Sequence, residues 1–402
     1  MSLAPAILLD ADIRAIEGIV EPLGRRGVPL VAMSTRPDCP VFYSRYVTRR
    51  VRVPGPFDEK ARVDALLRLP ERGVVFPSDD VSARTLARHR DVLVSEGHRL
   101  GISSPESLES GFDKWKCYET AMRLGIPMPT TRLIPDGEDP EPIARAVGYP
   151  LVIKGSTLAG GAYARVTDLA GLTGAMSRVR EIAGRPENQS RRSRIIAQTW
   201  IDCAMDDLWC VETLYRRDKR PAGFLTLRKI RTNVNRDGSF GSRMYAGEVA
   251  PHAQLEAMTE RLLTHLDWRG FAHLDWMRSS RDGRFYLTEI NPRLPGFSSV
   301  LAKSGFDLAY LYYADLEGLP APEPKPRRTL YLETLRYPGD LSSAAITIAR
   351  GQYPVGALLK SYLRAVVWPP RVAVEFLSWR DPGMTLAVLK RDVRTILGEV
   401  FR

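Results

Sequence analysis

The chain has 402 residues, 44% of them hydrophobic and 26% charged, which is typical of a globular protein with two or three domains. No stretch approaches the roughly 18–20 consecutive apolar residues of a transmembrane helix. The net charge of +11 comes mostly from arginines spread along the chain. Because no nucleic-acid-binding module is recognisable, we expect no nucleic-acid partner. We favour the interpretation that this charge is ordinary solvated surface, and attraction of anionic substrates is the alternative.

The N-terminal segment is apolar at residues 6–9 and lacks the basic region and cleavage site of a signal peptide. We expect it to form a first strand. The four cysteines contain no C-x-x-C pair, and the histidines lack the spacing of zinc ligands. Free thiols and a cytoplasmic location are therefore expected.

Residues 5–112 alternate between strand and helix patterns. Strands are expected at 7–9, 28–33 and 74–77, and helices near 11–25, near 58–69 and from about Ser78. This alternation predicts a Rossmann-like parallel sheet with crossover helices. The turn after the first strand has no glycines, so the fingerprint of dinucleotide binding is absent and NAD is not expected.

Asp79 and Asp80 follow the strand at 74–77, at the sheet edge where open α/β sheets hold ligands. The favoured interpretation is that Ser78 and Asp79 cap the next helix.

Three further regions follow this N-terminal domain. We predict domains at 1–112, 113–200 and 201–320, followed by a linker and a basic, helical C-terminal extension at 321–402. The linker prediction rests on the proline-rich stretch at 320–328.

Two lysines stand where phosphates could bind. Lys114 precedes a helix pattern, and Lys154 ends an apolar strand that leads into a loop rich in small residues. A lysine at the end of a buried strand is costly unless it meets an anion. The small residues of the loop can bring backbone N–H groups over phosphates.

Other polar groups follow the strands at 193–201 and 224–230. The end of the first can offer main-chain groups to a purine edge, and an acid a few residues later can bind ribose hydroxyls. At the end of the second strand and just after it, Arg228, Lys229 and Arg231 could face phosphate and a substrate carboxylate, with a solvated basic edge as the alternative.

The stretch from 270 to 293 is the most informative. Two apolar runs flank the turn at 281–283, which predicts a β-hairpin. Glu289 and Asn291 would lie on one face, about 6.5–7 Å apart at the backbone, opposite Asp275 on the partner strand. Such oxygen ligands suit Mg²⁺ completed by substrate phosphates. An ordinary polar hairpin face is the alternative.

In this order, the motifs resemble the ATP-grasp superfamily over roughly residues 5–310. The series runs from Lys114 through the strand ending in Lys154, the segment 198–201 and Asp275 to Glu289-x-Asn291-x-Arg293. The resemblance implies an ATP-grasp fold of mixed α/β and α+β class behind the N-terminal domain.

The resemblance also implies roles for particular residues. Lys114 and Lys154 would contact ATP phosphates, under a lid at 155–161 that includes Gly155, Ser156, Gly160 and Gly161. Main-chain groups of Thr199 and Ile201 would bind adenine beside Gln198, and Asp207 would bind ribose. Mg²⁺, or Mn²⁺ in its place, would be held by Asp275, Glu289 and Asn291. Arg293, with Arg228 or Arg231, would stabilise the transferring phosphoryl group.

The function implied is that of an ATP-dependent ligase joining a small carboxylate to an amine through an acyl phosphate. A bicarbonate-activating carboxylase of the same superfamily is one alternative, and a non-catalytic nucleotide-binding or membrane-surface scaffold is another. A homodimer would be compatible with either activity. For residues 330–402 we favour helices packed on the catalytic body over a surface that contacts anionic lipid or a protein partner.

Overall fold

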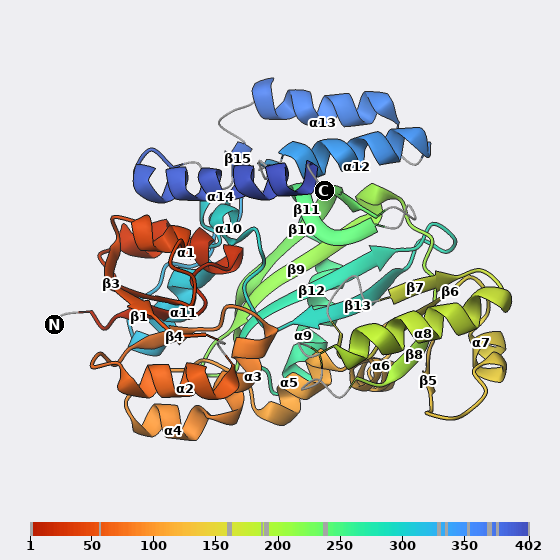
Figure 1. Cartoon of the computed structure of the whole chain (residues 1–402), viewed down its shortest axis with the longest axis horizontal. Helices are drawn as coiled ribbons and strands as arrows, with labels where there is room; N and C mark the ends of the chain where they lie inside the picture. The colour runs from red at the N-terminus through yellow and green to blue at the C-terminus, as the bar shows by residue number, and fades with distance from the viewer. Residues whose placement is uncertain are drawn as a thin grey trace.

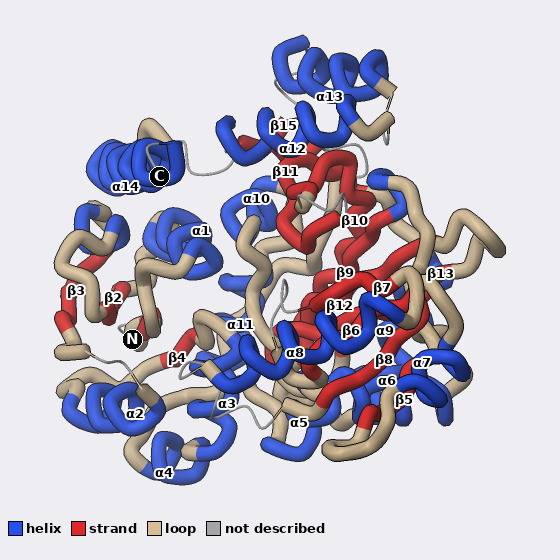
Figure 2. The backbone as a smooth tube through the Cα atoms, turned by 45° about the vertical axis from the view of Figure 1, so that its right-hand side comes forward, coloured by secondary structure: helices blue, strands red, loops and turns tan. Residues whose placement is uncertain are grey.

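Three sheets organise the molecule, which Figures 1 and 2 show as a computed structural model. The structure describes residues 3–55, 58–158, 163–185, 188, 193–235, 240–327, 331–333, 337–351, 354–367, 372–374 and 378–400. Among these residues, no helix is both long and apolar enough to cross a bilayer.

The N-terminal sheet is parallel, in the order β3-β2-β1-β4, which confirms the prediction for this region. Its strands are β1 (Ala6–Leu8), β2 (Leu30–Ser34), β3 (Val47–Arg52) and β4 (Val74–Phe76). The helical elements are α1 (Arg14–Gly24), η1 (Pro40–Tyr43), α2 (Glu59–Arg68), α3 (Asp80–Arg88), α4 (Arg90–Ser95) and α5 (Pro105–Phe112). The capping prediction is also confirmed, because the Asp79 carboxylate accepts a hydrogen bond from the Ser82 N–H at the start of α3.

The middle sheet is antiparallel, in the order β5-β8-β6-β7. It is built from β5 (Thr131–Ile134), β6 (Leu151–Gly155), β7 (Tyr163–Val166) and β8 (Ile195–Thr199). The helices of this region are α6 (Lys114–Arg123), α7 (Glu141–Val147) and α8 (Ala170–Gly184). Apolar residues of β6 and α8 share one core, so the end of β6, which carries Lys154, is firmly placed.

The third sheet has seven strands in the order β13-β12-β9-β10-β11-β14-β15. Its strands are β9 (Leu208–Tyr215), β10 (Pro221–Val234), β11 (Phe240–Val249), β12 (Gly270–Arg278), β13 (Phe285–Asn291), β14 (Tyr331–Glu333) and β15 (Val372–Val374). The accompanying elements are η3 (Met205–Asp207), α9 (Ala253–His265), α10 (Ser298–Lys303) and α11 (Leu308–Glu317). β12 and β13 pair antiparallel, which confirms the predicted hairpin.

The C-terminal extension contains more than helices. Its helices are α12 (Tyr337–Ala349), α13 (Val355–Val367) and α14 (Pro382–Val400). Its short strands β14 and β15 extend the large sheet beyond β11. The three helices lie along one end of the molecule in Figures 1 and 2.

Buried contacts fix the N-terminal sheet against the large sheet. The hydroxyl of Tyr312 on α11 donates to the Val75 carbonyl of β4 and accepts from the Gly101 N–H, each at 3.0 Å. Gly270 opens β12 with a φ of +85°, and a Cβ there would lie 2.2 Å from the Gly101 carbonyl oxygen. Only glycine allows both this conformation and this approach. The site strands are thereby held next to the carboxyl edge of the N-terminal sheet.

Candidate active site

One face of the large sheet carries two cross-strand rows of polar side chains. The strands β9, β12 and β13 are neighbours, and their register aligns residues across all three. The first row is Glu212, His273 and Asn291, and the second row is Cys210, Asp275 and Glu289. Because residues two apart in a strand share a face, all six point the same way. The acids and the amide predicted from the hairpin are therefore brought together.

The buried centre of these rows is a chain of alternating charges. The Asp275 carboxylate bonds the Lys229 ammonium through Oδ1 at 2.5 Å and His273 Nε2 through Oδ2 at 3.1 Å. His273 Nδ1 lies 2.5 Å from the Glu212 carboxylate. Burial would lower the pKa of His273, but the carboxylates of Glu212 and Asp275 outweigh it and raise that pKa to about 9. His273 is therefore a cation at neutral pH.

The same contacts keep Asp275 ionised. Burial acts to raise the pKa of Asp275, but Lys229 and His273 hold it well below its usual range. Both of its oxygens are occupied by cationic partners. Asp275 thus serves in this structure as the counter-ion of Lys229 and His273.

Glu289, Asn291 and Arg293 lie at the margin of the rows, on the edge strand β13 and just after it, where Glu289 and Arg293 are partly exposed and Asn291 is buried. The Lys114 ammonium lies 3.1 Å from Glu289 Oε1 and donates to the Leu158 carbonyl at 2.9 Å. Arg293 donates to Asp80 at 3.0 Å and to the Asn291 side-chain oxygen at 3.4 Å. Asp80 follows β4 of the N-terminal sheet, Lys114 belongs to the region of the middle sheet, and Glu289 lies on β13 of the large sheet. The margin therefore combines residues from all three regions.

A cavity of about 340 Å³ opens between the middle sheet and the hairpin. Four predicted residues line it: Lys154, Gln198, Thr199 and Ile201. Its further lining includes Val152, Trp200, Asp202, Met277 and Thr288. The sequence could have predicted Met277, because it lies two residues after Asp275 on the same strand and such residues share a face. A second cavity, of about 350 Å³ between α1 and α14, contains none of the predicted residues.

Lys154 and Arg165 are the cations in the lining of this cavity. Burial and the neighbouring Lys114 lower the pKa of Lys154 to about 7, although Glu289 acts in the opposite direction. An ammonium with so low a pKa is stabilised by any anion that enters.

The first residues of the loop after Lys154 are bonded to their surroundings. The Ser156 carbonyl accepts from the Lys114 N–H at 2.8 Å, and the Thr157 N–H donates to the Ser193 hydroxyl at 3.2 Å. Gly155, Ser156 and Leu158 are buried. Residues 155–158 are therefore bonded and buried in this structure, and the mobility of the lid stays a prediction. Gly160 and Gly161 lie outside the described residues.

Three of the predicted residues lie away from the two rows and their margin. Arg231 is buried against the C-terminal extension and bonds both oxygens of Asp340 at 3.0–3.2 Å. Arg228 pairs with Glu248 at 2.6 Å. Lys229 lies beside Asp275, where these arginines were predicted. Arg228 faces the opposite side of the sheet because it is next to Lys229 in β10. The irregular register between 229 and 231 directs Arg231 away from Asp275.

The third displaced residue is Asp207. It lies in η3, with the nearest atom of Arg278 3.9 Å away, and it does not line the cavity. Asp202 does line it and accepts a hydrogen bond from the Trp200 indole at 3.0 Å. Asp202 is thus the acid available at the cavity, five residues before the predicted one.

A thiolate metal site in the rows is disfavoured. The ligand atoms of Cys210, Glu212 and His273 lie within 4.8 Å of one another. However, burial and the nearby Glu212 carboxylate raise the pKa of the Cys210 thiol well above its usual value. Both ring nitrogens of His273 are also bonded to carboxylates. Glu289 and Asn291 offer hard oxygen ligands at the margin, where Lys114 and Arg293 contact them.

Comparison with known proteins identifies the fold. No protein-family model matches the sequence, and a search of curated proteins finds no match. Among solved structures, biotin carboxylase from Campylobacter jejuni in complex with β,γ-ATP matches with a TM-score of 0.66 and 14% identity, over 81% of this chain and 74% of that chain. Carboxyaminoimidazole ribonucleotide synthase from Aspergillus clavatus, complexed with ATP, matches with a TM-score of 0.62 and 15% identity, over 82% and 81%.

A third match is the biotin carboxylase domain of 2-oxoglutarate carboxylase from Hydrogenobacter thermophilus, in complex with MgADP, ADP and bicarbonate. Its TM-score is 0.63 at 14% identity, over 82% of this chain and 74% of that chain. All three are ATP-grasp enzymes. The chain therefore has the ATP-grasp fold with an N-terminal α/β domain, as its motif series predicts.

Proposed function

We propose that the protein is an ATP-dependent ligase that activates a carboxylate as an acyl phosphate and couples it to an amine, releasing ADP and phosphate. The observation that carries the proposal is that Lys154, which lines the cavity, neighbours Lys114 and Glu289, and that Asn291 and Arg293 follow Glu289 along the same face. Cations and oxygen ligands are what phosphoryl transfer requires, since its catalysis is mostly positioning and charge neutralisation.

The cavity suits an adenine ring. Val152 and Met277 supply apolar walls, and Thr199 and Ile201 supply main-chain groups at the end of β8. The Thr199 N–H already donates to the Thr130 carbonyl at 2.9 Å, so its own carbonyl is the group we assign to the purine. For the ribose hydroxyls we propose Asp202 in place of Asp207.

Glu289 and Asn291 fit a hard divalent cation. A carboxylate and an amide oxygen on neighbouring positions of one strand face suit Mg²⁺, with Mn²⁺ as the alternative ion. The hairpin pattern predicts Asp275 as a third ligand, but its two oxygens bond Lys229 and His273. We therefore propose Glu289 and Asn291 as the ligands. When bound there, the ion would neutralise charge on the ATP phosphates.

The remaining chemistry falls to the chain's own cations. Lys154 and Lys114 would bind the phosphates, and Arg293 would stabilise the charge on the phosphoryl group as it moves to the substrate carboxylate. An oxygen of the substrate carboxylate attacks the terminal phosphorus of ATP, the bond between that phosphorus and ADP breaks, and an acyl phosphate forms. The amine then attacks the acyl carbon, and phosphate leaves. No side-chain nucleophile is needed.

A bicarbonate-activating carboxylase is the second candidate, because two of the matched structures are biotin carboxylases and one contains bicarbonate. ADP release should be measured against a library of carboxylates and amines, alone and in pairs, with and without bicarbonate. A ligase requires a carboxylate–amine pair for full turnover, whereas a carboxylase responds to bicarbonate. Tight ATP binding without turnover under any condition would indicate a non-catalytic nucleotide-binding protein and contradict both.

Lys154 gives a prediction that depends on pH. Its pKa of about 7 in the free protein means that it is mostly neutral at pH 8.5, whereas bound phosphates favour its charged form. ATP binding should therefore take up a proton, and ATP affinity should fall as pH rises above about 7. Calorimetry in buffers of different ionisation enthalpy measures this uptake. In Lys154→Ala, affinity should fall about tenfold or more and the uptake should vanish. Equal ATP affinity in wild type and variant would refute the assignment.

Arg293 should act on the rate. We expect Arg293→Ala to lower kcat by about 10²–10³ with little change in ATP affinity, because the lost cation stabilises the transferring group and not bound ATP. Asp80→Asn is the matched control, since it removes the partner of Arg293 but keeps the cation. A variant that binds ATP weakly yet turns over normally at saturation would contradict this role.

A further inference from the structure

Exposed apolar side chains are concentrated on the C-terminal extension. Thirteen large hydrophobic side chains are exposed among the described residues, and eight of them lie between residues 348 and 393. Isolated exposed apolar residues are ordinary, but a concentration on one segment marks an interaction surface.

Helix α13 is apolar on its outer face. Val355, Leu359 and Leu363 are 48%, 57% and 60% exposed, and their spacing of four places them on one stripe. Leu358 and Ser361 are buried on the opposite side, where Ser361 contacts Arg231. A helix that only covered the protein body would carry its apolar stripe inward.

Helix α14 has two apolar faces. Met384 and Val388 are buried against the body, as ordinary packing requires. Leu386, Leu389 and Val393 are 58%, 46% and 52% exposed and form a second stripe. Packing on the catalytic body, which the sequence favours for this segment, accounts for the first face, whereas the second is left exposed by the residues that the structure describes.

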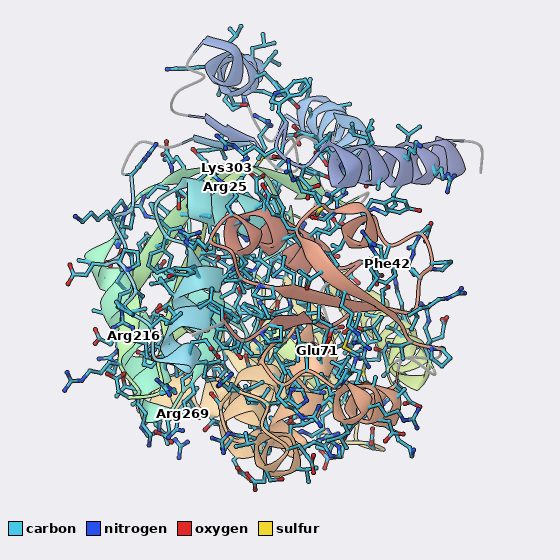
Figure 3. The ribbon with its side chains drawn as sticks, turned by 90° about the vertical axis from the view of Figure 1, so that its left-hand side faces the viewer. Arg25, Phe42, Glu71, Arg216, Arg269 and Lys303 are labelled. Atoms are coloured by element: carbon cyan, nitrogen blue, oxygen red, sulfur yellow. The ribbon has the colours of Figure 1, made fainter. Side chains whose placement is uncertain are left out.

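Ion pairs anchor α14 to the body with its outer stripe exposed. Arg391 pairs with Glu17 of α1, and Asp392 pairs with Arg14 at 2.9 Å. In Figure 3 the C-terminal helices lie along one end of the molecule, and the labelled Arg25, Phe42 and Lys303 lie on the body beneath them. These ion pairs hold α14 on the body with its second stripe facing outward.

The charge around the stripes is positive. Lys360, Lys390 and Arg394 are exposed beside the apolar residues. The nearby acids Asp340 and Asp392 are paired with arginines. A second copy of the chain would set these cations against one another, which is unfavourable. A surface that is apolar and negatively charged would satisfy both the stripes and the cations.

We propose that α13 and α14 bind the surface of an anionic lipid bilayer, with their outer stripes in the interface and their lysines and arginines at the lipid phosphates. Helices of this kind lie in the plane of the membrane, and binding strength scales with buried apolar area and with attraction to anionic lipid. Trp379, 99% exposed just before α14, is the type of residue that membrane interfaces favour. The proposal does not depend on the reaction catalysed.

Co-sedimentation of the full-length protein with vesicles tests it. We expect binding to phosphatidylcholine vesicles that contain phosphatidylserine, release at high salt, and little binding to phosphatidylcholine alone. Two double variants, Leu359→Glu/Leu363→Glu and Leu386→Glu/Leu389→Glu, should each weaken binding about tenfold or more. Lys390→Glu/Arg394→Glu should weaken it by about fivefold for each cation and reduce its salt dependence.

The matched control is Val92→Glu/Val94→Glu on α4. These valines are 49% and 42% exposed, so the substitutions are equivalent in chemistry, and α4 lies at the opposite end of the molecule in Figure 1. This variant should bind vesicles like wild type, and all variants should keep the wild-type circular dichroism spectrum. Absence of vesicle binding, or equal losses in the control, would overturn the proposal. So would a dimer in sedimentation velocity that the stripe variants abolish, because a second copy would then cover the surface.

Discussion

Glu289→Ala is expected to remove ATP turnover almost completely while leaving the protein folded. Its carboxylate is the one charged ligand we propose for Mg²⁺ and is also the partner of Lys114 at 3.1 Å. Losing it should lower kcat by about 10² or more and raise the Mg²⁺ concentration needed for half-maximal rate. A steady-state ADP-release assay across a Mg²⁺ titration measures both. Retention of more than about a tenth of wild-type turnover, a loss under about 1.4 kcal/mol, would contradict the metal assignment.

Two further variants distinguish loss of the metal ligand from loss of the ion pair with Lys114. Glu289→Gln keeps the shape and removes the charge, so it should resemble Glu289→Ala if the metal is what matters. Glu248→Gln is the matched control, because Glu248 also pairs with a cation on a strand of the same sheet but lies outside the cluster. It should keep wild-type turnover. A similar loss in both proteins would mean that the assay reports sheet stability and not the site.

Sequence periodicity was a good guide where local pattern determines structure. The hairpin of β12 and β13 follows from two alternating apolar runs around a turn, and alternation alone put Asp275, Glu289 and Asn291 on one face. β3 was missed because its sequence carries arginines at exposed positions of an edge strand, which resembles a loop.

The partners of the site residues could not be predicted in the same way. Pairing of Asp275 with Lys229 depends on the order of strands in the sheet, and periodicity does not specify that order. The choice of Lys229 over Arg231 depends on a local irregularity in β10 that has no clear signal in the sequence. Arg231 is bonded to Asp340, 109 residues away, so only the folded chain reveals its role.

Arg231 leads to the largest stability effect that we expect. Its side chain is 2% exposed, bonds Asp340 and Ser361, and stacks on the Tyr362 ring at 4.0 Å. Arg231→Ala would leave the buried Asp340 carboxylate without its cation. Removing one partner of a buried ion pair typically costs about 3–5 kcal/mol, so the free energy of unfolding should fall by about that amount in urea denaturation.

The double variant Arg231→Met/Asp340→Leu distinguishes a structural role from a catalytic one. Replacing a whole buried ion pair by apolar side chains is often close to neutral, so this variant should recover most of the lost stability. It should also turn over ATP at nearly the wild-type rate, because neither side chain reaches the cluster of Lys114, Glu289 and Arg293. A double variant that is stable but inactive would show that Arg231 takes part in the reaction. In that case Arg231 would leave Asp340 when substrate binds, and the register of β10 between 229 and 231 would differ between the free and the substrate-bound protein.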